Sequence, residues 1–121
     1  MVNQQHEIAN EIINWAEEKK AEKIMKIDVT QKSDFADIMI ICEGLNELHL
    51  RAIADNIKDK SKLEELNLMA VEGYDNASWI LMDFGDIIVH IFKHDTRKYY
   101  QLEQLWNVNA KNKPKLEQSN D

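Results

Sequence analysis

Residues 78–106 read SWILMDFGDIIVHIFKHDTRKYYQLEQLW, and this stretch decides the fold. The apolar runs 79–83 and 86–92 are separated by Phe84 and Gly85, and the second run is rich in β-branched Ile and Val. Two apolar runs that are joined by a tight turn containing glycine predict a β-hairpin.

The residues that follow the predicted hairpin show helical spacing. Apolar and aromatic side chains recur three or four positions apart at Tyr99, Leu102, Leu105 and Trp106. Asp95 or Thr96 can serve as the N-cap of this segment. The stretch therefore predicts a strand, a turn, a second strand and a short helix.

Two amphipathic helices are predicted earlier in the chain. Residues 4–21 and 47–61 each carry their apolar side chains on a single helical stripe. The stripe residues are Ile8, Ile12, Trp15 and Ala16 in the first segment, and Leu50, Ile53, Ala54 and Ile57 in the second.

Three further strands are predicted between and after these helices. Apolar and polar residues alternate over 25–30, which indicates a half-buried strand whose inward residues are Met25, Ile27 and Val29. Residues 35–42 are almost continuously apolar, as expected of a central strand that is covered on both faces. Residues 67–71 complete a crossover unit of strand, helix and strand, whose two strands should run parallel.

The predicted fold class is therefore α/β, with a single-domain mixed sheet of about five strands and flanking helices in the order α-β-β-α-β-β-β-α. Residues 1–108 are predicted to form this domain. Residues 109–121 are polar and show no period, so they predict a flexible tail.

Composition narrows the class of protein. The single cysteine, Cys42, cannot support a disulfide framework, and no signal peptide is apparent, so a cytoplasmic protein is expected. No apolar run approaches the roughly 20 residues of a membrane span. The net charge of −7 disfavours direct binding to nucleic acid and favours a basic partner.

Candidate metal and catalytic groups are weak. His90 and His94 stand about 13 Å apart if both lie on one strand, which is too far for a shared metal. The pairs Asp34 with Asp37 and Asp83 with Asp86 have a spacing of three, which places them on opposite faces of a strand or around a turn. The three glycines are isolated, so no phosphate-binding loop is present, and no cofactor is expected.

Aromatic and acidic side chains are concentrated around the hairpin and the last helix. Trp79 and Ile80 point to opposite faces of their strand, and the adjacent Tyr99 and Tyr100 cannot face the same core. Some of Trp79, Tyr100 and Trp106 are therefore expected to be exposed. Exposed aromatics beside carboxylates predict a protein-binding patch, although a wholly structural role in the core is the alternative.

The chain resembles the ribosomal silencing factors, also called the Iojap-like family, over about residues 5–107. The resemblance rests mainly on WILMDFGDIIVHIF at 79–92 and on RKYYQLEQLW at 97–106. Shorter matches are Asp34-Phe35 before the strand IMIIC, Gly44, the helical segment 52–55 and the pair Glu72-Gly73.

The resemblance implies a protein that is not an enzyme. Members of the family bind protein fourteen of the large ribosomal subunit, on the face that meets the small subunit. They thereby block subunit joining and lower translation when nutrients are short. The fold is similar to that of nucleotidyltransferases, but this sequence has no Gly-Ser dipeptide and no Asp-x-Asp motif.

Carried over by position, the partner-binding residues are expected to be Trp79, Leu81, Asp83, His90, Tyr100, Glu103 and Trp106. The aromatics would be apolar anchors, and Asp83 and Glu103 would meet Lys or Arg of the basic ribosomal protein. The flat sheet face could also pair with a second copy, so a homodimer is a further expectation. The alternative is a metal-dependent nucleotidyltransferase-like enzyme that uses Asp34, Asp37 and Asp83.

Overall fold

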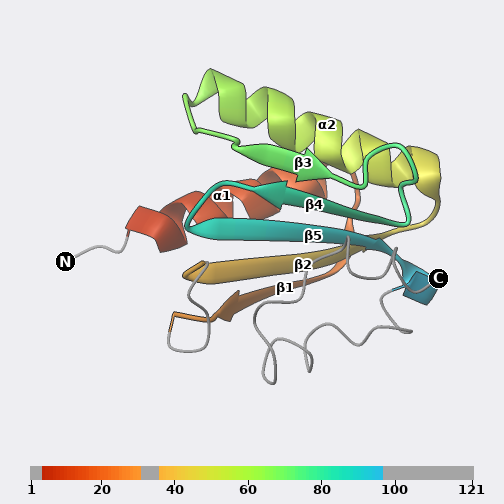
Figure 1. Cartoon of the computed structure of the whole chain (residues 1–121), viewed down its shortest axis with the longest axis horizontal. Helices are drawn as coiled ribbons and strands as arrows, with labels where there is room; N and C mark the ends of the chain where they lie inside the picture. The colour runs from red at the N-terminus through yellow and green to blue at the C-terminus, as the bar shows by residue number, and fades with distance from the viewer. Residues whose placement is uncertain (1–3, 31–35, 97–121) are drawn as a thin grey trace.

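The computed structural model describes residues 4–30 and 36–96, which form two helices and a five-stranded sheet (Figure 1). In chain order the elements are α1 (Gln4–Glu18), β1 (Glu22–Asp28), β2 (Ile38–Gly44), α2 (Glu47–Leu63), β3 (Ala70–Glu72), β4 (Trp79–Asp83) and β5 (Ile87–Lys93). Residues 94–96 begin a further helical turn. The rest of the predicted last helix and the predicted tail lie outside the described residues.

The sheet has the strand order β1-β2-β5-β4-β3. β2 and β5 run parallel at its centre, and the other neighbouring strands pair antiparallel. The predicted mixed α/β sheet is therefore confirmed, and so is the hairpin of β4 and β5. β3 runs parallel to β2, as expected of a crossover unit, but the hairpin strands lie between them.

Both helices pack on one face of the sheet, which we call the helix face. α1 and α2 bury their predicted stripes there, since Ile12, Trp15, Leu50 and Ile53 share one core cluster with strand residues. The strand side chains of this cluster are Ile38, Ile40, Cys42, Ile80, Met82, Ile87, Val89 and Ile91. Burial of these aliphatic side chains is the main force that holds the helices on the sheet.

The opposite side of the sheet, which we call the second face, has its own buried cluster. Its members include Met39 and Ile41 of β2, Trp79 and Leu81 of β4, and Ile88 and Phe92 of β5. Both sides of β2, β4 and β5 are therefore buried. This explains why their sequences are nearly continuous in apolar residues rather than alternating.

The edge strands differ most from the prediction. β1 starts at Glu22 rather than Met25, with an irregular register between those two residues. Met25 and Ile27 do lie on the second face with Val29, but Met25 is 40% exposed. β3 starts three residues later than predicted. Each edge strand has only one neighbour, so its own sequence pattern constrains its ends less than that of a central strand.

Candidate partner-binding face

The four predicted partner-binding residues within the described ranges lie together on the second face. Trp79, Leu81 and Asp83 alternate along β4, so all three point to the same side of the sheet. His90 of β5 is the direct register partner of Leu81 and shares that side. Tyr100, Glu103 and Trp106 lie outside the described residues.

Trp79 and His90 are joined by a buried hydrogen bond. The indole Nε1 of Trp79 donates to Nδ1 of His90 over 3.0 Å. Burial lowers the pKa of His90 from its ordinary value of 6.5 to about 3. The imidazole is therefore neutral at physiological pH, and Nδ1 acts as the acceptor.

Phe92 completes an aromatic group with these two residues. Its ring centroid lies 4.7 Å from that of Trp79 and 6.1 Å from that of His90. Trp79 of β4 contacts both rings of β5 across the strand pairing, and Trp79 and Phe92 are register partners. Such contacts add to the stabilisation that burial alone supplies, so this end of the hairpin is well defined.

Trp79, Leu81 and His90, which we call the floor of the second face, are buried rather than exposed. Trp79 is 6% exposed, Leu81 3% and His90 0%. Trp79 and Ile80 do point to opposite faces as expected, but both faces of the sheet are covered. Trp79 is therefore not one of the exposed aromatics that the sequence led us to expect.

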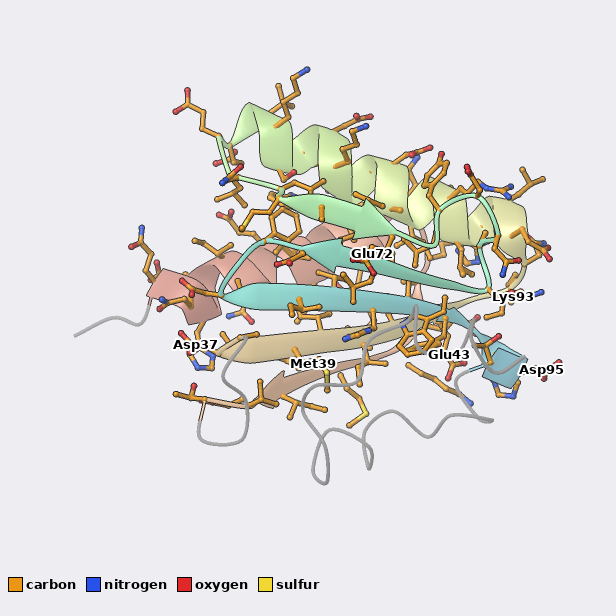
Figure 2. The ribbon with its side chains drawn as sticks, viewed as in Figure 1. Asp37, Met39, Glu43, Glu72, Lys93 and Asp95 are labelled. Atoms are coloured by element: carbon orange, nitrogen blue, oxygen red, sulfur yellow. The ribbon has the colours of Figure 1, made fainter. Side chains whose placement is uncertain are left out.

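Carboxylates lie at the edges of the second face. Asp83 is half-buried at the end of β4, where its Oδ1 accepts a hydrogen bond from the backbone N–H of Gly85 over 2.8 Å. Glu43 pairs in register with Phe92, and Glu72 pairs with Leu81. Figure 2 labels both glutamates and Met39, which lies on the same face.

Glu43 and Glu72 were not among the predicted site residues. Glu43 is buried, and its Oε1 lies 3.0 Å from Nδ1 of His94. Alternation from Met39 and Ile41 would have placed Glu43 on this face, because strand side chains repeat every two residues. No such signal exists for Glu72, since the three-residue strand β3 shows its orientation only through its pairing with β4.

The candidate metal groups do not come together in the described part of the chain. No cluster of three or more His, Cys, Asp or Glu side chains there could hold a metal ion. His90 bonds Trp79, whereas His94 contacts Glu43. Cys42 is buried on the helix face. Asp34 lies outside the described residues.

Within residues 4–30 and 36–96, neither helix has the length and apolar character that crossing a bilayer requires.

The sequence matches a known protein family. The family model described as "Ribosomal silencing factor during starvation" matches residues 2–121. A protein of Bacillus subtilis named ribosomal silencing factor RsfS is 41% identical over 90 residues, which are 74% of this chain and 76% of that protein. A more distant mouse protein is named "Mitochondrial assembly of ribosomal large subunit protein 1" and is 26% identical over 82% of this chain and 45% of its own length.

A solved structure supports the same relationship. The crystal structure of a protein from Chromobacterium violaceum superposes with a TM-score of 0.81 and 28% identity, covering 90% of this chain and 88% of that one. The family match spans nearly the whole sequence, and the topology agrees with it. The chain therefore belongs to the family of ribosomal silencing factors, the family to which its sequence motifs point.

Proposed function

We propose that this protein is a cytoplasmic ribosomal silencing factor. It binds the large ribosomal subunit at its protein fourteen and sterically blocks joining with the small subunit, which represses translation when nutrients are limiting. Family membership supports this proposal. One observation supports the assignment of the binding site: four of the expected contact residues share the second face, namely Trp79, Leu81, Asp83 and His90.

The contact has two parts that differ in accessibility. Asp83 is half-buried at the edge of the face and can meet a basic side chain with little rearrangement. Trp79, Leu81 and His90 form the floor and are nearly inaccessible. Direct contact with the floor therefore requires that partner binding uncovers the second face, and the buried aromatic rings then supply apolar contact area.

Charge favours a basic protein partner over bare ribosomal RNA. The chain carries a net charge of −7, and the half-buried carboxylates of Glu72 and Asp83 lie beside the apolar floor. Such a surface attracts Lys and Arg side chains and repels phosphates. Bulk beyond the contact, rather than any chemical step, excludes the small subunit.

Co-sedimentation with separated ribosomal subunits tests the proposal. We expect the protein to sediment with large subunits and not with small subunits. The double variant Asp83→Asn with Glu103→Lys should bind about tenfold or more weakly, because it removes acidic contacts. Asp83→Asn keeps an oxygen that can accept from Gly85, so the β4–β5 turn is preserved.

A matched variant controls for net charge. Asp59→Asn with Glu64→Lys changes the total charge by the same amount at exposed positions at and just beyond the C-terminal end of α2. This variant should bind within about twofold of the wild type, because surface charges remote from a contact contribute little. Equal binding by the wild type and both variants would reject Asp83 and Glu103 as contacts with the partner.

We also propose that the protein is not an enzyme. Neither the Gly-Ser nor the Asp-x-Asp motif is present in its sequence. A thermal unfolding scan with Mg²⁺ or Mn²⁺ and nucleoside triphosphates should leave the Tm unchanged, because only ligands that bind the folded state raise it. A concentration-dependent rise in Tm would favour the nucleotidyltransferase-like alternative.

A further inference from the structure

Glu72 holds a carboxylate at the β3 edge of the second face. It is the last residue of β3 and the register partner of Leu81, which in turn pairs with His90. These three side chains form a row across the sheet, from the edge to the aromatic floor. Figure 2 shows Glu72 at this edge, on the strand next to β4.

The backbone that follows Glu72 packs closely against β4. Gly73 has a φ of +81°, and a Cβ at this position would lie 2.1 Å from the carbonyl oxygen of Trp79. The chain therefore leaves β3 by a path that only glycine permits. Because Glu72 immediately precedes this close contact, its backbone position relative to Trp79 and Leu81 is well defined.

One oxygen of this carboxylate is buried without a hydrogen-bond partner. Oε1 of Glu72 exposes less than 1 Å² and accepts no hydrogen bond from the described part of the chain. Within residues 4–30 and 36–96 no basic side chain forms an ion pair with Glu72. Arg51 reaches the following loop, but its guanidinium donates to the backbone carbonyls of Tyr74 and Asp75.

An unsatisfied buried carboxylate oxygen destabilises the free protein. Buried polar atoms are bonded in most proteins, and each exception calls for an explanation in structure or function. A cation supplied by a partner would satisfy Glu72, and the partly desolvated site would strengthen the resulting ion pair.

We propose that Glu72 is an anionic anchor for a Lys or Arg side chain of the protein that binds the second face. The proposal rests on the proposed function and deepens it. Glu72 pairs with Leu81, and Asp83 pairs with Ala70, so the two carboxylates are diagonal neighbours on the same side of the floor. The partner segment therefore carries its basic groups together, beside an apolar centre. This pattern identifies a basic protein surface and not a nucleic acid as the occupant.

The test compares Glu72→Gln and Glu72→Lys with the same changes at Glu64, an exposed residue at the end of α2. The affinity for purified large subunits is measured at two salt concentrations, and the Tm of each free variant is recorded. Glu72→Gln should weaken binding about tenfold and reduce its salt dependence, and Glu72→Lys should weaken it further. Both Glu64 variants should bind within about twofold of the wild type.

The free protein supplies a second readout. Because Glu72→Gln removes the charge of a half-buried side chain that has one unpaired oxygen, its Tm should stay close to or exceed that of the wild type. A clear fall in Tm with unchanged affinity would show a structural role and overturn the proposal.

The remaining outcomes also separate the hypotheses. Tighter binding by Glu72→Lys would place a phosphate opposite this residue and overturn the assignment to a basic protein. If the wild type binds large subunits and Glu72→Gln binds equally well, only the role of Glu72 is rejected. If the wild type does not bind, the proposed function is rejected and this inference with it.

Discussion

At the scale of single residues, His90 shows how burial determines the chemistry of one ring. Its side chain is inaccessible to solvent and accepts a hydrogen bond from Trp79. A proton on Nδ1 would remove that bond and place a charge inside the sheet. The folded state therefore holds the imidazole neutral, with a pKa of about 3.

This pKa predicts acid sensitivity with a defined sign. Between about pH 3 and pH 6.5 the unfolded chain binds a proton at His90 that the folded chain does not. The free energy of unfolding should therefore fall as pH decreases below 6.5, by about 1 kcal/mol per pH unit near pH 5.5, and show no contribution from His90 above that value. Urea unfolding at a series of pH values measures this slope.

The slope is best measured between pH 5 and 6.5. The carboxyls of Glu18, Asp28 and Glu47 have lowered pKa values, owing chiefly to their hydrogen bonds, and remain ionised in that range. His90→Gln should flatten the slope even if it lowers stability overall. His94→Gln, at an exposed position, should retain most of it. An unchanged slope in His90→Gln would show that another group is responsible.

Gly73 and Gly85 provide a matched pair for backbone strain. Both have a positive φ, but a Cβ at Gly73 would lie 2.1 Å from a backbone oxygen, whereas at Gly85 it would lie 3.3 Å from the flexible Met69 side chain. Gly73→Ala should therefore lower the free energy of unfolding by roughly 2–4 kcal/mol, and Gly85→Ala by about 1 kcal/mol. Equal losses in chemical denaturation would contradict the close contact of Gly73 with β4.

At the scale of elements, polar side chains connect the two helices. Asn56 of α2 donates to the backbone oxygen of Trp15 and to Glu18 at the end of α1. Nε2 of His49, in the first turn of α2, lies 2.7 Å from the carbonyl oxygen of Lys19. These contacts hold the end of α1 against α2 and complement their shared apolar packing.

The N-terminus of α2 depends on a single cap. Asn46 has an extended backbone, and its side chain accepts from the N–H of His49 over 2.9 Å. Asn46→Ala should reduce the free energy of unfolding by about 1 kcal/mol, because one helix donor loses its partner. Asn46→Ser, which can still cap, should stay within about 0.5 kcal/mol of the wild type in the same urea titration. Similar losses in both variants would exclude capping as the cause.

The elements that the sequence predicts best are those with strong internal patterns. The stripes of α1 and α2 and the two apolar runs of the hairpin carry enough periodicity to identify them. The ends of β1 and β3 depend on pairing with a neighbour, which no local pattern encodes. The insertion of β5 and β4 between β2 and β3 is likewise a property of the whole sheet.

At the scale of the whole molecule, the candidate site could be predicted only in part. Alternation along residues 79–83 places Trp79, Leu81 and Asp83 on one side of a strand. It could not show that both sides of that strand are buried, since accessibility depends on the rest of the fold. The sequence singles out Glu72 only as part of a family match, and its place beside Leu81 could not be predicted because it depends on the register of β3 with β4.

Under the proposed function, the molecule as a whole acts by its bulk. Both sides of its central strands are packed, so it can dock as a folded body. Its acidic net charge of −7 suits a basic docking site. On this account the protein acts by occupying a surface of the large subunit.

The most direct measurement is the extent of subunit joining, recorded by light scattering after large subunits are saturated with the protein. We expect joined particles to decrease in proportion to the fraction of large subunits occupied. Incubating the protein with small subunits alone and then removing it should have no effect. Normal joining of fully occupied large subunits would contradict steric silencing, even if binding itself were tight.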